Sequence, residues 1–166
     1  MRFGATLCVA QFRHSETLFM TSQIIPVEPF DCIVFGGTGD LAERKLIPAL
    51  YQRQRDGQLS EPTRIIGASR SAMSTEDYRK FAQAAIKEFV KADEYDKAQV
   101  EQFLQRISYV AVDATSDAGW EELKNEIGND SKRIRAFYLA VSPSLFGDIA
   151  SRLKSYKLVT DHTRII

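Results

Sequence analysis

Three glycines that directly follow an apolar run constrain the fold of this chain more than any other feature. Cys32 to Phe35 are apolar, Gly36, Gly37 and Gly39 come next, and apolar residues at helical spacing begin immediately afterwards. A strand, a tight turn and a helix in this order form the first corner of a parallel α/β sheet. The remaining strands and helices must therefore assemble around this corner.

The small residues of the corner have the spacing that a dinucleotide requires. In Gly37-x-Gly39-x-x-Ala42, one glycine allows a sharp turn, the next allows the backbone to approach a pyrophosphate, and a small third residue allows close packing of helix on strand. The first helical turn would then direct amides and the positive end of its dipole at the phosphates. Glycine-rich corners also occur for structural reasons, so the turn alone leaves both interpretations open.

A longer stretch around the corner is far more specific. The sequence is F-G-G-T-G-D-L-A over residues 35–42 and R-K-L-I-P-A-L-Y over residues 44–51. This resembles the amino-terminal signature of the glucose-6-phosphate dehydrogenase family, which has G-A-S-G-D-L-A or a close variant, then basic residues, an apolar residue, a proline and an aromatic. The resemblance extends over about residues 30–166. The candidate cofactor-binding residues in this stretch are Gly36, Gly37, Thr38, Gly39, Asp40, Leu41, Ala42 and Lys45.

The second predicted strand, residues 63–69, ends at Arg70 and Ser71. At this place in a nicotinamide-binding fold, an acidic side chain binds the ribose 2′-hydroxyl of NAD, whereas an arginine accommodates the 2′-phosphate of NADP. No acidic residue follows Arg70 before Glu76, so NADP is the expected cofactor. A solvated cation at the strand end is the alternative.

Strands and helices alternate along the rest of the chain. Further strands are expected at residues 106–113, 134–141 and 164–166. The strand at residues 134–141 is apolar on both faces, as a buried parallel strand should be. Helices are expected at residues 41–55, with a kink at Pro48, and at 75–90, 95–105, the stretch before Gly128, and 145–156. This pattern predicts an α/β fold with a doubly wound, Rossmann-type parallel sheet in three α/β/α layers.

Other candidate residues follow the third and fourth predicted strands. The resemblance implies adenine-side contacts at Asp113 and Ala114, although a cap by Asp113 on the following helix is equally open. It also implies that Pro143 and Phe146 lie beside the ribose and nicotinamide. Phe146 lacks the hydroxyl of the tyrosine common in the family. Trp120 is expected in the core.

Composition limits the other possibilities. The 166 residues, 44% of them hydrophobic, suffice for one buried domain, and 22 basic against 22 acidic residues give no attraction to nucleic acid or anionic lipid. Two cysteines, Cys8 and Cys32, provide neither a disulfide framework nor a metal site, which fits a cytoplasmic protein. No run approaches the ~20 apolar residues of a membrane span. We expect residues 1–27 to be a disordered extension, with Met20 a plausible true start, and residues 28–166 to form the Rossmann domain.

The resemblance implies the NADP-binding domain of an oxidoreductase of the pentose phosphate pathway, which converts glucose 6-phosphate to 6-phosphogluconolactone and acts as a homo-oligomer. The family's later E-K-P-F-G motif, with its substrate-binding lysine, and D-H-Y-L-G-K motif, with its general-base histidine, are absent from these 166 residues. We therefore expect a domain truncated before the substrate domain, with no catalytic residue and no activity alone. The alternative is a Rossmann-type module that binds NADP for regulation and catalyses nothing.

Overall fold

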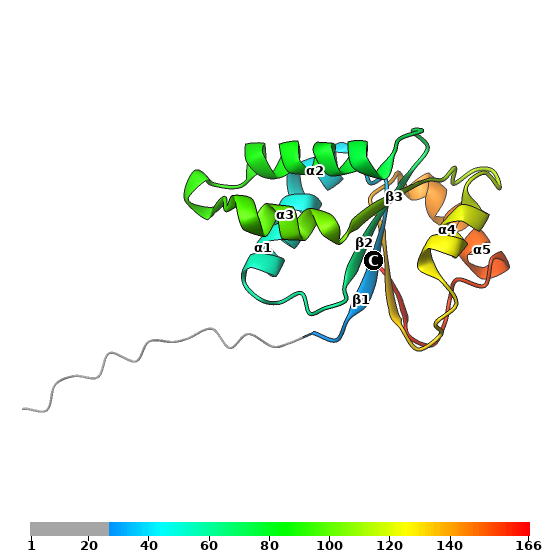
Figure 1. Ribbon diagram of the computed structural model, residues 1–166. Helices are drawn as coiled ribbons and strands as arrows, with labels where there is room; N and C mark the ends of the chain where they lie inside the picture. Colours follow the sequence, from blue (N-terminus) through cyan, green and yellow to red (C-terminus); the bar gives the residue numbers. More distant parts are fainter. Residues whose placement is uncertain (1–26) are drawn as a thin grey trace, which may run out of the picture.

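The computed structural model describes residues 27–166, which form a single parallel sheet flanked by helices (Figure 1). The sheet has the strand order β3-β2-β1-β4-β5. Its strands are β1 (Phe30–Phe35), β2 (Arg64–Ser69), β3 (Ile107–Ala111), β4 (Ile134–Leu139) and β5 (Thr163–Ile165), and every neighbouring pair is parallel. The chain winds outward from β1 to β3 and then from β4 to β5, so the strand order reverses between β1 and β4. The predicted doubly wound fold is confirmed.

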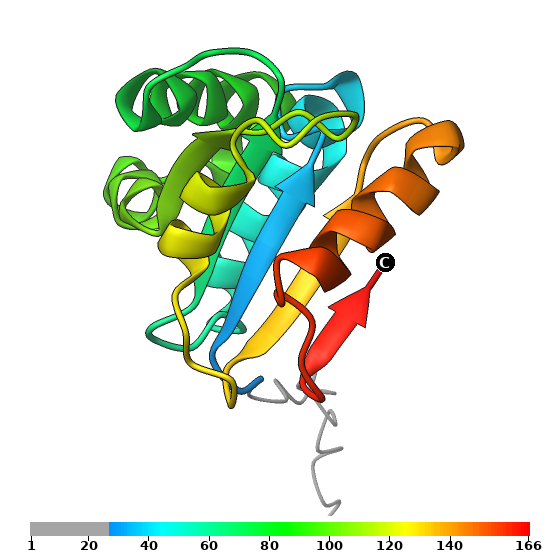
Figure 2. The same ribbon diagram turned by 90° about the vertical axis from the view of Figure 1, so that its right-hand side faces the viewer.

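Helices cover both faces of the sheet and complete three layers (Figure 2). One face carries α1 (Ile47–Arg55), α2 (Thr75–Phe89) and α3 (Lys97–Gln105), and the other carries α4 (Trp120–Ile127) and α5 (Phe146–Ser155). Three short helical turns, η1 (Ala42–Leu46), η2 (Ala92–Glu94) and η3 (Pro143–Leu145), precede longer helices. The predicted extension over residues 1–27 lies, apart from Val27, outside the described residues.

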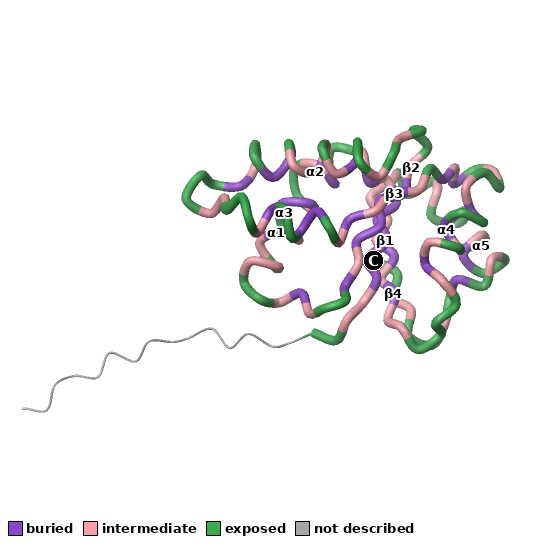
Figure 3. The backbone as a smooth tube through the Cα atoms, in the orientation of Figure 1, coloured by how far each residue is buried: buried purple, intermediate pink, exposed green. Residues whose placement is uncertain are grey.

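The alternation of side chains along β1 explains why its sequence is continuously apolar. Cys32 and Val34 belong to the core under α1, α2 and α3, whereas Ile33 and Phe35 belong to the core under α4 and α5. A central strand covered on both faces therefore requires an apolar residue at nearly every position. Buried residues accordingly follow the strands and the inner sides of the helices (Figure 3). Trp120 is fully buried in the second core, as predicted, with its ring 5.5 Å from that of Phe35.

The first predicted helix consists of two segments because of Pro48. Residues 42–46 form a π-helical turn, and α1 begins only at Ile47. Pro48 thus occupies the first turn of an α-helix, where its missing N–H and fixed φ are tolerated. Similarly, α3 begins at Lys97 rather than Tyr95, because the Asp96 carboxylate accepts a hydrogen bond from the Gln99 amide and caps the helix.

The prediction that residues 134–141 are apolar on both faces is wrong at Arg135, which is only 3% exposed in β4. Its guanidinium donates to the carbonyls of Gly128 and Asp130 after α4 and of Leu158 after α5. Burial lowers the pKa of Arg135. A cation therefore satisfies carbonyls that helix ends leave without intrahelical partners.

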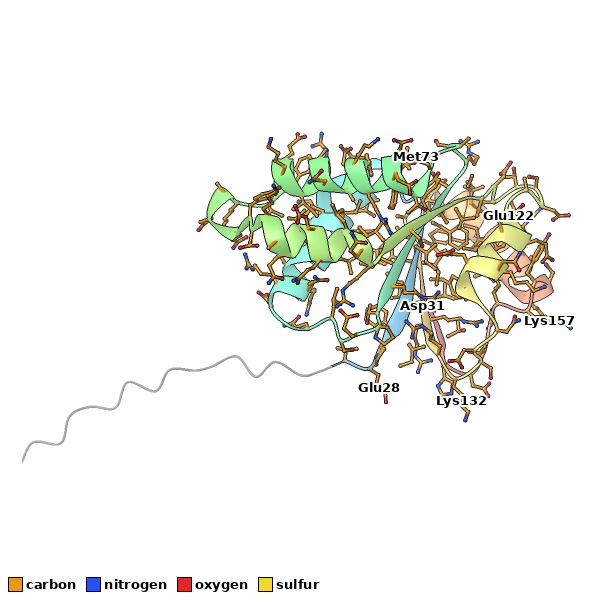
Figure 4. All side chains as sticks on the ribbon, viewed as in Figure 1. Glu28, Asp31, Met73, Glu122, Lys132 and Lys157 are labelled. Carbon is orange, nitrogen blue, oxygen red and sulfur yellow. The ribbon has the colours of Figure 1, made fainter. Side chains whose placement is uncertain are left out.

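A buried carboxylate completes the amino-terminal edge of the sheet. Asp31, in β1, is fully buried and accepts two hydrogen bonds from Arg64, at 2.6 and 2.8 Å, and one from Arg133 at 2.6 Å. The hydrogen bonds to Asp31 raise the pKa of Arg64. Asp31 lies at the opposite end of the sheet from Met73, which follows β2 (Figure 4). Charged side chains thus occupy the amino-terminal edge of the sheet, whereas the carboxyl-terminal edge is accessible to a ligand.

Candidate functional site

A crevice of about 400 Å³ lies at the carboxyl ends of the strands, the edge toward which the arrowheads point in Figure 2. It spans the place between β1 and β4 where the strand order reverses, which is where doubly wound sheets bind ligands. Its lining residues come from the strand ends and the turns after them: Phe35, Gly36, Thr38, Gly39, Ala68, Ser69, Arg70, Ser71, Val112, Asp113, Ala114, Thr115, Val141, Ser142 and Leu145.

The sharp turn after β1 occurs at Gly36, and not at Gly37 as predicted. Gly36 has φ +79°, and a Cβ built on it would lie 2.2 Å from the carbonyl oxygen of Ala140. Only glycine fits there. The amides of Gly36 and Gly37 both donate to the Ala68 carbonyl in β2, at 2.8 and 3.2 Å. The small residues that the geometry of this corner requires therefore begin at Gly36, which changes the spacing to Gly36-x-x-Gly39-x-x-Ala42.

Gly37 has a packing role in this turn. A Cβ on Gly37 would lie 3.0 Å from Gly67 Cα and from the hydroxyl of Tyr78. The Tyr78 hydroxyl donates to the Gly37 carbonyl at 2.9 Å, and burial raises the pKa of this tyrosine. The absence of a side chain at Gly37 lets the turn rest directly on β2 and α2.

Gly39 is small for a different reason. It is exposed at the crevice, and a Cβ on it would meet only the Gly36 carbonyl oxygen, at 3.2 Å. A side chain at Gly39 would therefore require the Gly36 carbonyl to shift by a few tenths of an ångström, a much milder clash than at Gly36, and it would occupy crevice space that a ligand would lose. Three residues later, Ala42 is fully buried and begins the helical segment. This segment points the positive end of its dipole at the carboxyl edge of the sheet, which suits an anionic ligand.

Hydroxyl groups connect the glycine turn with the end of β2. The Ser69 Oγ lies 2.9 Å from Thr38 Oγ1 and 2.7 Å from Tyr109 Oη, and Tyr109 donates to the Ser71 carbonyl at 2.6 Å. Arg70 lies between the two serines and is exposed at the crevice. A fixed backbone therefore presents a long, mobile cation at this edge.

Asp113 shapes the turn after β3. Its Oδ1 accepts hydrogen bonds from the amide and the hydroxyl of Thr115, both at 2.8 Å. These bonds, with a smaller contribution from the charge of Arg70, lower the pKa of Asp113. The alternative that Asp113 caps the next helix is wrong, because α4 begins after Gly119 and its first turn has no side-chain cap.

Comparison with known proteins identifies the family. Residues 33–166 match the family model described as "Glucose-6-phosphate dehydrogenase, NAD binding domain". The chain belongs to this family. It is 58% identical over 147 residues to the glucose-6-phosphate 1-dehydrogenase of Rhizobium meliloti (strain 1021), covering 89% of this chain and 30% of that protein. It is 37% identical over 132 residues to the glucose-6-phosphate 1-dehydrogenase of Leuconostoc mesenteroides, and this match covers 76% of this chain and 26% of that protein.

Solved structures agree with this assignment. The crystal structure of glucose-6-phosphate 1-dehydrogenase from Mycobacterium avium superimposes with a TM-score of 0.74 and 30% identity, covering 82% of this chain and 29% of that one. For a glucose-6-phosphate dehydrogenase in complex with glucose 6-phosphate, the TM-score is 0.69 and the sequence identity 38%. The match covers 83% of this chain and 29% of that one. The chain thus spans less than a third of the length of the dehydrogenases that it matches.

The crevice contains only some of the predicted site residues. Those that line it are Gly36, Thr38, Gly39, Arg70, Ser71, Asp113 and Ala114. Gly37 and Ala42 are buried behind the turn. Asp40 forms an exposed ion pair with Arg44 at 2.6 Å, and Lys45 is exposed on η1. The structure does not bring these four residues into the lining.

The three remaining predicted residues, Leu41, Pro143 and Phe146, are also absent from the lining. Pro143 is exposed in η3, between the lining residues Ser142 and Leu145. Leu41 and Phe146 are exposed apolar side chains, at 43% and 40%. The sequence interpretation missed Ser69, Thr115 and Ser142. The sequence could have indicated them, because each is a hydroxyl residue at or shortly after the end of a predicted strand.

Neither a metal site nor a membrane-spanning helix is present within residues 27–166. They contain no group of three or more His, Cys, Asp or Glu side chains that could hold a metal ion. None of the helices in this part of the chain is long and apolar enough to cross a membrane.

Proposed function

We propose that residues 28–166 bind NADP in the crevice and are the coenzyme domain of a glucose-6-phosphate dehydrogenase. The family assignment supports a dinucleotide, because the matching model is that of an NAD-binding domain. The observation that carries the proposal is the exposed backbone of Gly39 in the crevice lining, where a side chain would have one close protein contact, the Gly36 carbonyl oxygen at 3.2 Å, and would otherwise occupy the crevice. A backbone that can be approached closely at the start of a helix suits a pyrophosphate.

The choice of NADP over NAD rests on Arg70. Its guanidinium can form charge-assisted hydrogen bonds to a 2′-phosphate at the end of β2, and the hydroxyl of the neighbouring Ser71 offers a neutral donor. An acidic residue at this edge would instead repel the phosphate. In the described part of the chain, Asp113 is the acidic side chain in the crevice lining, and it belongs to the neighbouring strand end.

The other lining residues are assigned to the two ends of a dinucleotide that extends across the crevice. The Asp113–Thr115 turn after β3 would lie beside the adenosine, and the Ser142–Leu145 segment after β4, with Pro143 and Phe146 next to it, beside the nicotinamide ribose. Bound NADP would supply the hydride acceptor. The residues of this chain would bind and orient it, with Lys45, Asp40 and Leu41 at the periphery.

We further propose that the substrate chemistry lies outside these 166 residues. Oxidation of glucose 6-phosphate requires a base for the hydroxyl proton and a cation for the sugar phosphate. The family's lysine and histidine motifs for these tasks are absent from the sequence, and the chain spans less than a third of its relatives. The isolated chain should therefore bind coenzyme without oxidising glucose 6-phosphate.

Isothermal titration of the purified chain tests the proposal. NADP and adenosine 2′,5′-bisphosphate are expected to bind, whereas NAD and 5′-AMP, which lack the 2′-phosphate, should bind more weakly. An absence of binding by all four compounds to folded protein would overturn the proposal. A preference for NAD would retain the dinucleotide site and reject the assignment to NADP.

A further inference from the structure

Tyr109 is one strand removed from the glycine turn, yet hydroxyl groups link it to the crevice. It lies in β3, is 7% exposed, and its ring centroid is 4.8 Å from that of Tyr78. Its Oη contacts the Ser71 carbonyl, and the Ser69 Oγ connects it with Thr38 in the turn after β1. A single chain of polar groups therefore joins the ends of three neighbouring strands.

Counting protons fixes the direction of this chain. The Tyr109 hydroxyl has one proton, and the Ser71 carbonyl, 2.6 Å away, can only accept it. The contact of 2.7 Å between Tyr109 and Ser69 must then use the serine proton, and the contact of 2.9 Å between Ser69 and Thr38 must use the threonine proton. Each proton is used once, so loss of the phenol oxygen leaves the Ser69 hydroxyl without its acceptor and the Ser71 carbonyl without its donor.

The chain holds the backbone on both sides of Arg70. The Ser69 hydroxyl donates to the same phenol oxygen that donates to the Ser71 carbonyl, so both residues that flank Arg70 are bound to one rigid side chain. Arg70 itself is exposed, and its position relative to a ligand depends on where its backbone is held. A recognition group on a rigid support loses less entropy on binding.

We infer that Tyr109 is a positioning residue for coenzyme selectivity. Through Ser69 and Ser71 it holds the backbone of Arg70 at the distance from the glycine turn that a 2′-phosphate requires. This inference rests on the proposed function, because it concerns the same crevice. NAD has no 2′-phosphate for Arg70 to bind, so its affinity should depend on Tyr109 much less.

The test is Tyr109→Phe, which keeps the ring packing on Tyr78 and removes only the phenol oxygen. NADP affinity should fall about three- to tenfold, the effect of one neutral hydrogen bond, and NAD affinity by less than about twofold. Both are measured by titration of the purified chain. The matched control is Tyr51→Phe, which removes a fully buried phenol oxygen that donates to Glu94 and accepts from the Asp96 amide in the α2–α3 connection. It should lower stability and leave the ratio of the two affinities unchanged.

The outcomes separate this inference from the proposed function. A parent chain that binds neither coenzyme rejects both. A parent that prefers NADP, with a Tyr109→Phe variant that loses affinity for both coenzymes equally or for neither, rejects the inference alone. If circular dichroism shows that Tyr109→Phe is unfolded, Ser69→Ala breaks the same chain from the other side. Unchanged selectivity in a folded Ser69→Ala variant then rejects the inference.

Discussion

The glycines of the turn after β1 are small for different reasons. At Gly36 a side chain would collide with the backbone of Ala140, directly after β4, whereas at Gly39 it would enter the crevice. Sequence alone could not separate these roles, because both residues fit the same fingerprint. The difference lies in the positive φ of Gly36 and in its neighbour Ala140, which is remote in sequence.

This difference predicts opposite effects for two substitutions. Gly39→Val should abolish NADP binding, because the valine occupies ligand space. It should leave the circular dichroism spectrum nearly unchanged and lower the thermal midpoint only slightly, because its one close protein contact is with the Gly36 carbonyl oxygen. Gly36→Ala should lower the free energy of unfolding by about 3 kcal/mol through strain and the contact with Ala140. A Gly39→Val variant that binds NADP like the parent would show that the turn is purely structural.

Arg70 supports a sharper prediction at the same scale. Arg70→Ala should weaken NADP binding by about 1.5–3 kcal/mol, the value of a hydrogen bond to a charged group, which is roughly 10- to 150-fold. NAD binding should hardly change, and the NADP effect should shrink at high salt because the pair is exposed.

Lys45→Ala is the matched comparison for Arg70→Ala. Lys45 is also exposed, but it lies on η1 outside the crevice lining. If Lys45→Ala shows the larger loss of NADP affinity, the 2′-phosphate contacts the first helix. Equal losses of NADP and NAD in Arg70→Ala would mean that this arginine supports only the fold.

At the scale of strands and helices, the sequence predicted most elements within a few residues. Continuous apolar runs mark buried parallel strands, and Ser74 caps α2 through the Asp77 amide, as its sequence pattern indicates. The buried position of Arg135 could not be predicted. Its partners are backbone carbonyls after α4 and α5, which only the folded chain brings to β4. The same is true of the hydroxyl chain from Thr38 to Tyr109, because it requires the strand order.

Arg135→Met should therefore be costly although it conserves much of the side-chain volume. Three carbonyls would lose their donor, and we expect the free energy of unfolding to fall by about 2–4 kcal/mol. Urea denaturation followed by circular dichroism measures this. Arg164→Met, at an exposed position of β5, is the control and should change stability by less than about 0.5 kcal/mol. A similar small effect at both positions would show that Arg135 is not required.

At the scale of the whole molecule, the sheet divides the protein into two cores that both depend on β1. Cys32 lies in one of them, and burial, with a smaller contribution from Asp31, raises its pKa to about 12. Because only the thiolate reacts with disulfide reagents, this thiol should be inert in the folded protein at pH 8. Its reactivity therefore reports unfolding of the entire domain.

We predict that Cys32 reacts with Ellman's reagent only as fast as the domain opens, measured in a Cys8→Ser background that leaves one thiol. Saturating NADP should slow the reaction, because a ligand that binds only the folded state lowers the population of the open state. At 100 times the dissociation constant the slowing should approach about 100-fold. Rapid labelling that is insensitive to NADP would show that Cys32 is accessible through local motion.

The paired amides of Gly36 and Gly37 on the Ala68 carbonyl have a consequence for how a ligand is received. Glycine-rich loops commonly fluctuate and become ordered only around the molecule that they hold. Here two amides of the turn are hydrogen-bonded to the central strand β2, which holds the turn in place without a ligand. The wall that would face the pyrophosphate is in place beforehand, and association would depend on the fit of the coenzyme rather than on the ordering of the loop.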